Sequence, residues 1–452
     1  MKIVYQSLFL LVTASPIAVA APASALQNKP VVRDLTRPIT PVREPLKPLT
    51  KPVENVNKEL NTLTQDTSDI LVNAAGQLPK QLPILDKQGN TLFVETEVEN
   101  GFRAIAREWM ISVSSDELAD FHLPFMDIIE RNDYPSLNLH VIRFRVPSEW
   151  DSREALATQL SEALMTQLDR NHVYATQNVP TPTKITSTLP ATTYHTPAQA
   201  CDASMRVGMI DTAVQLNHPA FGEGRIIAQQ FLPNVADAPN AHGTAVAGVL
   251  IGKSAELLPL LPKATIYSAA IFYARNEISQ GATTQHLLQA LAWLVQEKVL
   301  VINMSLTGPA NRLLHQGIQA AHKRGVGLVA AVGNEGPTAA PLFPAAYPEA
   351  IAVTAVDASE LIYRWANRGE HVTFAAPGVS VFTARANDGF GVETGTSMAA
   401  PVVSAFMACD RAQHDDSLIN TTNRLASQAK DLGEPGRDPI YGFGLLKPNT
   451  KP

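Results

Sequence analysis

The feature of this sequence that most constrains its fold is a set of three short motifs beyond residue 200, each carrying one reactive side chain. An apolar strand ends in Asp211. A segment with closely spaced Gly and Ala places His242 near the start of a tightly packed helix. A third segment places Ser397 at the N-terminus of a helix that is apolar on all sides and therefore buried. The three motifs occupy residues 207–212, 241–248 and 395–401.

Asp211, His242 and Ser397 are the three residue types that nucleophilic acyl transfer requires. A serine hydroxyl is a weak nucleophile at neutral pH, so a base must accept its proton as it attacks. Histidine suits that role because its pKa lies near working pH, and an aspartate fixes its tautomer and stabilises the imidazolium. Lipases and esterases of the α/β-hydrolase type centre on G-x-S-x-G, which the segment Gly-Thr-Ser-Met fits badly. Within its helix, Pro401 is expected in the first turn, where no amide partner is lost.

Together the motifs resemble the subtilase (subtilisin-like serine protease) family over residues 201–450, and the chain order Asp, His, Ser is that of subtilisin. The resemblance implies an α/β fold, with a mostly parallel sheet and helices on both faces. It also implies a serine endopeptidase that acts on polypeptide substrates through an acyl-enzyme. Family members usually have Gly where this chain has Ala213, which could demand a different turn. Further segments that match family signatures are 301–306, 308–309, 330–336, 347–356 and 375–379.

The resemblance also implies the other site residues. Asn334 and the backbone amide of Ser397 would donate to the charged oxygen of the tetrahedral intermediate. A substrate would add as an extended strand between two segments of the chain. Small residues suggest a roomy, apolar first pocket, and no charge is evident in these segments, so we expect a broad or apolar preference. The substrate-binding residues implied are Gly281, Ser305, Leu306, Gly308, Ala331, Gly333 and Thr396.

The chain before residue 201 is predicted to contain a leader and two linkers. Residues 1–25 combine Lys2, an apolar middle and two A-x-A sites, which is typical of a secretory signal peptide. A membrane anchor would need about 20 uninterrupted apolar residues. We therefore expect a secreted protein, extracellular or periplasmic, with no membrane span after signal removal. The remaining segments are a Pro-rich linker at 26–52, an amphipathic helix and connection at 53–92, and a Pro/Thr-rich linker at 179–200.

Residues 93–178 are predicted to form a small ferredoxin-like α+β module in the order β-α-β-β-α-β. The family resemblance implies that this module is a subtilase propeptide. In this family the propeptide assists folding and inhibits the enzyme until it is cleaved. The chain would then be a self-inhibited precursor (a zymogen), with its own N-terminal module as the intramolecular inhibitor. The expected strands are 105–113, 137–146 and 172–177, and the expected helices start at a capping box at Ser114 and span 155–168.

Composition excludes several classes of function. A net charge of −6 gives no basic surface for nucleic acid. Two cysteines exclude a disulfide scaffold and any four-thiolate metal site. Cys201 and Cys409 could form one disulfide in a secreted protein or remain two buried thiols. The chemistry requires no cofactor and no catalytic metal. Many family members bind structural calcium, but no site can be placed here.

Two other functions remain compatible with the sequence. One is a non-catalytic peptide-binding protein on a subtilase fold, against which the complete set of Asp211, His242, Ser397 and Asn334 argues. The other is a hydrolase of non-peptide esters, which the order of the motifs disfavours.

Overall fold

The structure is a computed structural model that describes residues 78–176, 201, 203–233, 236, 238–276 and 279–448. These residues belong to one compact unit of the chain. The predicted signal peptide, the first linker, the amphipathic helix and the second linker lie outside the described residues. Below, residues 78–176 are called the N-terminal module and residues 201–448 the C-terminal domain.

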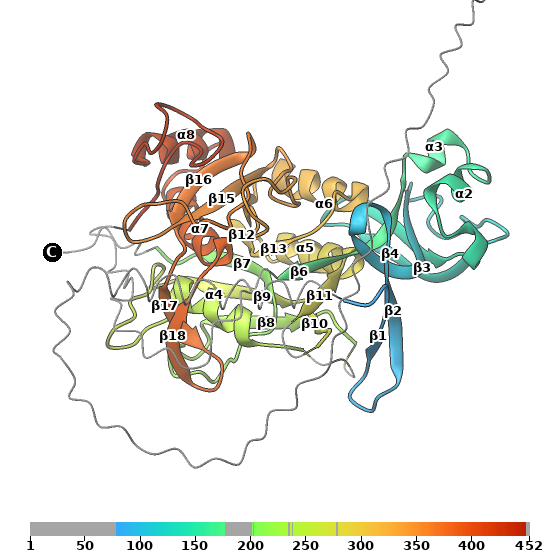
Figure 1. Cartoon of the computed structure of the whole chain (residues 1–452), viewed down its shortest axis with the longest axis horizontal. Coiled ribbons are helices and arrows are strands. Elements are labelled where there is room, and N and C mark those ends of the chain that lie inside the picture. The colour runs from blue at the N-terminus through green and yellow to red at the C-terminus, as the bar shows by residue number, and fades with distance from the viewer. Residues whose placement is uncertain are drawn as a thin grey trace, which may run out of the picture. The chain divides into compact units, whose positions relative to one another are not determined.

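The C-terminal domain is built on a seven-stranded parallel sheet (Figure 1). Its strand order is β16-β15-β14-β12-β7-β9-β8. This confirms the predicted α/β class. The strands are β7 (Arg206–Asp211), β8 (Ile226–Gln230), β9 (Thr265–Ala270), β12 (Val301–Met304), β14 (Gly327–Ala331), β15 (Ala350–Val356) and β16 (Val372–Pro377).

Helices cover both faces of this sheet. Along β14, Leu328 and Ala330 pack with α5 and α6, whereas Val329 and Ala331 pack with α4 and α7. Because both faces are buried, the inner strands are apolar almost throughout, whereas the edge strand β8 is mostly exposed. The helices are α4 (Ala241–Ile251), α5 (Thr284–Gln296), α6 (Arg312–Lys323), α7 (Thr396–Gln413) and α8 (Leu418–Gln428).

A hairpin of β17 (Val381–Arg385) and β18 (Gly389–Glu393) precedes α7 and packs against α4. The hydroxyl of Thr383 donates to the carbonyl of Ala245 at 2.7 Å. A side chain at Gly248 would collide with Thr383, so glycine is what lets the hairpin approach the helix.

The N-terminal module is an antiparallel sheet with two short helices on it. Its strands run in the order β1-β2-β3-β6, with β5 and then β4 added beside β3. Trp109, Phe144 and Leu156 form the centre of its core. The elements are β1 (Gln81–Leu85), β2 (Thr91–Glu97), β3 (Arg103–Val113), β4 (Asp127–Tyr134), β5 (Leu139–Arg145), α2 (Arg153–Ala157), α3 (Glu162–Met165) and β6 (Leu168–Thr176).

The ferredoxin-like prediction for this module is met only in part. Residues 115–120 form turns and no helix, because Pro124 follows too soon. The capping contact exists, since the amide of Ser114 donates to Glu117 at 3.0 Å. β3 and β5 pair antiparallel, whereas a β-α-β unit would make them parallel. The single helix expected over 155–168 is two short helices instead.

Strands β1 and β2 of the module were not predicted, and β4 supplies a fourth strand that the predicted order contains but did not locate. β1 and β2 form a hairpin that begins ahead of the boundary expected at residue 93. β4 carries charged or polar side chains at five of its eight positions, Asp127, Glu130, Arg131, Asn132 and Asp133, so it lacks the alternation that marks a half-buried strand.

Strand β6 continues the module's sheet into the C-terminal domain. It pairs antiparallel with β3, with β11 (Gln280–Thr283) and with β13 (Leu306–Thr307). β10 (Tyr273–Ala274) then pairs with β11, and Figure 1 shows β6, β11 and β10 side by side. The result is one nine-stranded sheet built from both parts of the chain.

Candidate active site

Asp211 and His242 are brought into contact by β7 and α4. Nδ1 of His242 lies 2.7 Å from Oδ1 of Asp211, and the two residues are 6% and 0% exposed. The amide of Thr212 donates to the same carboxylate oxygen at 2.7 Å. α4 can approach this closely because Gly243 lies against the main-chain carbonyls of Thr212 and Ala213, where any side chain would collide.

The departure from the family pattern at Ala213 is accommodated without strain. The amide of Ala213 donates to the carbonyl of Pro239 at 3.0 Å. Among the described residues, Ala213 is not one of those with a positive φ. The turn after Asp211 therefore does not need glycine.

The pKa of His242 is raised above its ordinary value. Burial by itself lowers the pKa, but the charge of Asp211 and its hydrogen bond outweigh burial, and the charge of Glu393 adds to them. The site therefore stabilises the imidazolium, which is the form a general base reaches when it accepts a proton.

Ser397 is the second residue of α7 and is 2% exposed. Its hydroxyl oxygen and Nε2 of His242 are both buried, and among the described residues neither has a hydrogen-bond partner. Buried polar atoms without partners are uncommon in folded proteins and call for an explanation. These two atoms are the ones between which a catalytic proton would move.

Ser305 supports the turn that carries Ser397. Pro401 lies in the second turn of α7, not in the first as expected, so the carbonyl of Ser397 lacks its helical donor. The hydroxyl of Ser305 donates to that carbonyl at 3.0 Å. Nδ2 of Asn303 donates to Ser305 Oγ, and the hydroxyl of Ser404 donates to Oδ1 of Asn303, both at 3.0 Å.

Asn334 follows β14 and is tied to the start of α7. Its Oδ1 accepts hydrogen bonds from the amide and the hydroxyl of Thr396, at 3.0 and 2.9 Å. Gly333, with φ of 110°, makes the turn, and its amide donates to the Thr396 hydroxyl at 3.3 Å. The oxygen end of the amide is thus directed at Thr396, and the NH₂ end is directed away. The amide of Ser397 belongs to the first turn, which has no helical acceptor.

The structure gathers most of the predicted substrate-binding residues around β6. Leu306 pairs with Thr176, and Ala282, next to Gly281, pairs with Tyr174. The ring of Tyr174 lies against Gly308, where a side chain would collide with it. In contrast, Ala331 is fully buried in the core shared by α4 and α7.

Comparison with known proteins identifies the family of this chain. A model of the Subtilase family matches residues 202–444. The chain belongs to the subtilase family. The predicted membership of the subtilase family is confirmed. The match begins after the second linker, so the N-terminal module of this subtilase lies outside it.

Three relatives illustrate how far the similarity extends. The minor extracellular protease Epr of Bacillus subtilis is 30% identical over 249 residues, which is 54% of this chain and 38% of that protein. Subtilisin DY of Bacillus licheniformis is 30% identical over 255 residues, or 54% of this chain and 89% of the relative. Subtilisin E of Bacillus subtilis is 29% identical over 254 residues, or 54% of this chain and 64% of the relative.

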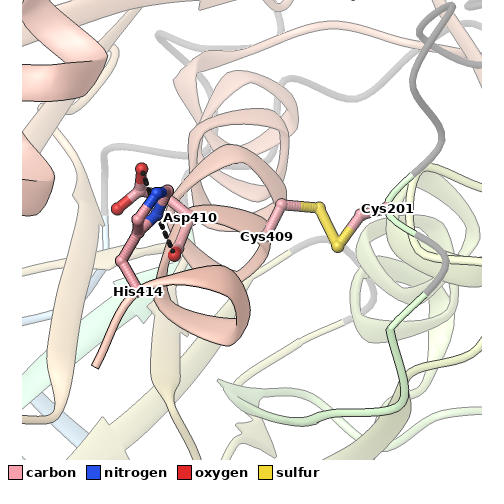
Figure 2. Close-up of a disulfide and its surroundings, with 4 residues drawn as sticks. All are labelled: Cys201, Cys409, Asp410 and His414. Carbon is pink, nitrogen blue, oxygen red and sulfur yellow. Dashed lines mark hydrogen bonds and ion pairs between the residues drawn. A yellow bond between two sulfur atoms is a disulfide. The ribbon is translucent and has the colours of Figure 1, made fainter.

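Cys201 and Cys409, which the sequence left undecided, form a disulfide with their Cα atoms 5.5 Å apart (Figure 2). The bond joins the start of the C-terminal domain to the last third of α7, whose first turn carries Ser397. Among the described residues, no group of three or more His, Cys, Asp or Glu side chains is arranged to hold a metal ion. Within the same residues, none of the helices has the length and apolar character needed to cross a membrane.

Two contributors to the site were missed by sequence reasoning. Glu393 acts on His242 from β18, and no local pattern marks it. The contact of Ser305 with Ser397 had a signal, because a proline four residues after Ser397 leaves that carbonyl without a helical donor.

Proposed function

We propose that this subtilase is a serine endopeptidase with Asp211, His242 and Ser397 as its catalytic triad. The observation that carries the proposal is the 2.7 Å contact of Asp211 with His242, beside a buried Nε2 and a buried Ser397 hydroxyl that have no other partners. Ser397 attacks the peptide carbonyl while His242 takes its proton, and His242 then protonates the leaving amine. Asp211 holds the imidazole and stabilises its charged form.

The oxyanion of the tetrahedral intermediate would be bound by Nδ2 of Asn334 and the amide of Ser397. Both groups lie at the N-terminus of α7, whose dipole favours negative charge. Removing one such donor typically lowers kcat by about 10²–10³-fold.

A serine-directed phosphonate tests the chemistry directly. We expect the wild-type protein to be labelled at Ser397, and Ser397→Ala and His242→Ala to take no label. A peptide-binding protein on the same fold would leave the wild type unlabelled as well. Comparing casein with simple esters then separates an endopeptidase from a hydrolase of non-peptide esters, because only an endopeptidase cleaves casein.

We further propose that the N-terminal module is an intramolecular inhibitor, so that the chain is made as a self-inhibited precursor. β6 lies between β11 and β13, where the family resemblance implies that substrate adds as a strand. Thr176 pairs with Leu306, which follows Ser305, and Ser305 bonds to the carbonyl of Ser397. The end of β6 is therefore held next to the turn that carries the nucleophile.

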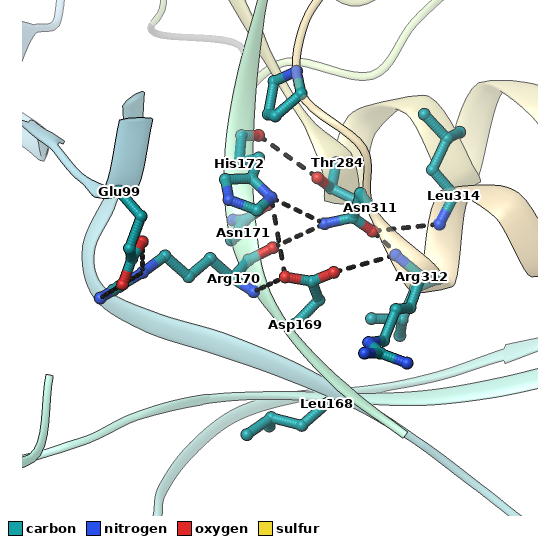
Figure 3. A network of polar contacts seen from close by, with 12 residues as sticks. Glu99, Leu168, Asp169, Arg170, Asn171, His172, Thr284, Asn311, Arg312 and Leu314 are labelled. Atoms are coloured by element: carbon teal, nitrogen blue, oxygen red, sulfur yellow. Dashed lines mark hydrogen bonds and ion pairs between the residues drawn. The ribbon is translucent and has the colours of Figure 1, made fainter. Parts of the chain in front are cut away.

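The contacts of β6 with two helices of the C-terminal domain support this role. Asp169 accepts the amide of Arg312, the first residue of α6, at 2.9 Å (Figure 3). Asn171 accepts the amide of Gln285, in the first turn of α5, at 3.2 Å. First-turn amides have no helical acceptor, so the module satisfies donors that the domain alone leaves open. This gives the module a role in folding as well as in inhibition.

Processing of the precursor provides the test. We expect the wild type to be cut within 179–200, and Ser397→Ala to remain a chain of about residues 26–452. Ser359→Ala, at an exposed turn, should be processed like the wild type. Cleavage of purified Ser397→Ala at the wild-type rate would refute self-processing.

We also propose that the protein is secreted, extracellular or periplasmic, after removal of residues 1–25. A relative is named an extracellular protease, and the first 25 residues have the pattern of a signal peptide. Mass spectrometry of the N-terminus of protein recovered outside the cytoplasm tests this, and retention of Met1 would contradict it.

A further inference from the structure

We propose that Arg275 and Tyr273 form a carboxylate-binding site that selects substrates carrying Asp or Glu at the position opposite Gly281. The inference rests on the proposed function, because it concerns the substrate preference of the same cleft. In the precursor, the site is filled by Glu95 of the N-terminal module.

The carboxylate of Glu95 is completely buried between the two parts of the chain. Nε of Arg275 and the hydroxyl of Tyr273 both donate to its Oε1, at 2.8 and 2.9 Å. Nε of Arg103, from the module itself, donates to Oε2 at 2.7 Å. Glu95 and Tyr273 are 0% and 1% exposed. The C-terminal domain therefore supplies two convergent donors for one carboxylate oxygen.

These donors meet directly above Gly281 of the substrate-flanking strand β11. A Cβ at Gly281 would lie 2.8 Å from Nε of Arg275, 2.9 Å from the Tyr273 hydroxyl and 3.0 Å from Oε1 of Glu95. Tyr273 pairs with Gly281 across β10 and β11, so both face the same side of the sheet. Only glycine at residue 281 leaves space there for a carboxylate.

The register of β6 shows which substrate residue faces this space. Val173 pairs with Thr283, and Tyr174 pairs with Ala282. One further step along this antiparallel register places Ala175 opposite Gly281. The hydroxyl of Thr176, the next residue, donates to the side chain of Gln280 at 3.0 Å, which agrees with that step.

A side chain at the position of Ala175 is therefore directed toward Arg275 and Tyr273. Directly opposed Cβ positions lie about 5 Å apart, a gap that a Glu side chain spans. In the precursor this residue is only an alanine, and Glu95 reaches the site from the neighbouring hairpin instead.

Release of the module removes Glu95 together with Arg103 and leaves Tyr273 on β10 and Arg275 directly after it. Both donors are then open to a new acceptor, and a hydrogen bond from an arginine to a carboxylate is stronger than a neutral one. A substrate Asp or Glu in the place of Ala175 supplies that acceptor. The sequence predicted a broad or apolar substrate preference, and this proposal replaces it with an acidic preference at one substrate position. The sequence did not indicate this, because Arg275 lies outside the segments from which the preference was inferred.

The test uses peptides that copy residues 169–188, either unchanged or with Ala175→Glu or Ala175→Gln. The enzyme is the protein recovered after expression of the full chain. We expect kcat/KM for the Glu peptide to exceed that for the Gln peptide by about tenfold, equivalent to ~1.4 kcal/mol. The ratio should fall toward one in high salt, because ions screen exposed charges.

Variants of the enzyme test whether Arg275 causes the preference for the Glu peptide. Arg275→Gln should bring the Glu-to-Gln ratio to about one, because the charge that distinguishes the two peptides is gone. Arg324→Gln, which removes an arginine from the surface end of α6, should keep the wild-type ratio. Each ratio compares two peptides cleaved by the same enzyme variant. A difference between variants in the fraction of folded protein therefore does not change the ratio.

The outcomes separate the two proposals. If no peptide is cleaved by processed protein that has been separated from its N-terminal module, the proposed endopeptidase activity fails. If the unchanged peptide is cleaved and the Glu and Gln peptides are cleaved equally, the endopeptidase stands and the acidic preference is overturned. In that case Arg275 and Tyr273 serve only to hold the module.

Discussion

The hydroxyl of Ser305 donates to the main-chain carbonyl of Ser397 at 3.0 Å, in the place of the amide that Pro401 lacks. The residue just before the strand β13 is therefore bonded to the turn that carries Ser397. The contact couples β13, which we propose to flank the substrate, to the proposed nucleophile.

Ser305→Ala should therefore lower both stability and kcat. The buried carbonyl of Ser397 would lose its donor, at a cost of about 1–3 kcal/mol in the free energy of unfolding. Adding Pro401→Ala should restore much of that loss, because alanine supplies the missing helical amide. Urea unfolding and peptide hydrolysis of the single and double variants measure this. A double variant no more stable than Ser305→Ala would contradict the account.

The pH dependence of kcat/KM should report the pKa of His242. General-base catalysis needs the neutral imidazole, so activity should rise with pH through a pKa above the ordinary value of about 6.5. The charge of Glu393 raises this pKa, so Glu393→Gln should move the acid limb to lower pH. Glu360→Gln, whose partners are Lys430 and Lys447, should leave the limb in place. An unchanged or upward shift in Glu393→Gln would exclude Glu393 from this role.

The disulfide between Cys201 and Cys409 should stabilise the C-terminal domain. It closes a loop with a sequence separation of 208 residues, and loops of this size are associated with about 3–5 kcal/mol. The double variant Cys201→Ser/Cys409→Ser should show this loss in denaturant unfolding. Reductant should lower the midpoint of the wild type and leave that of the double variant unchanged, and equal midpoints for the two oxidised proteins would contradict the expectation.

Release of the cleaved module should become easier at acidic pH because of His172. Its Nδ1 accepts a hydrogen bond from Nδ2 of Asn311 at 3.0 Å (Figure 3). The side-chain amide of Asn311 cannot flip to accept a hydrogen bond from a protonated His172, because its Oδ1 already caps α6. Burial lowers the pKa of His172, and Arg170 and Arg153 lower it too, against the opposite effects of Asp169 and Glu99.

In the complex the pKa of His172 lies below its ordinary value of about 6.5, so the released module takes up this proton more readily than the bound module. Affinity should be constant above that pH and should fall as pH drops below it. Size-exclusion chromatography of the processed complex at pH 7.5 and pH 5 measures the released fraction. His172→Gln should reduce the difference between the fractions released at pH 7.5 and pH 5. Equal release from the wild type at both pH values would refute the effect of His172.

The sequence alone was enough to predict the strand and the two helices that carry the triad candidates. A buried parallel strand ending in Asp211, a small-residue helix with His242 and an all-apolar helix starting near Ser397 are patterns set by neighbouring residues. Periodicity and short motifs record such patterns directly, so the α/β class and the triad candidates could be predicted.

The tertiary structure alone decided how distant segments combine. Periodicity does not encode which strand pairs with which, so the antiparallel pairing of β3 with β5 and the docking of β6 between β11 and β13 were not predictable from it. The same is true of the disulfide and of the meeting of Glu95 with Arg275 above Gly281. The disulfide and the contact of Glu95 with Arg275 each join residues more than a hundred positions apart, and such contacts form only when the whole core is assembled.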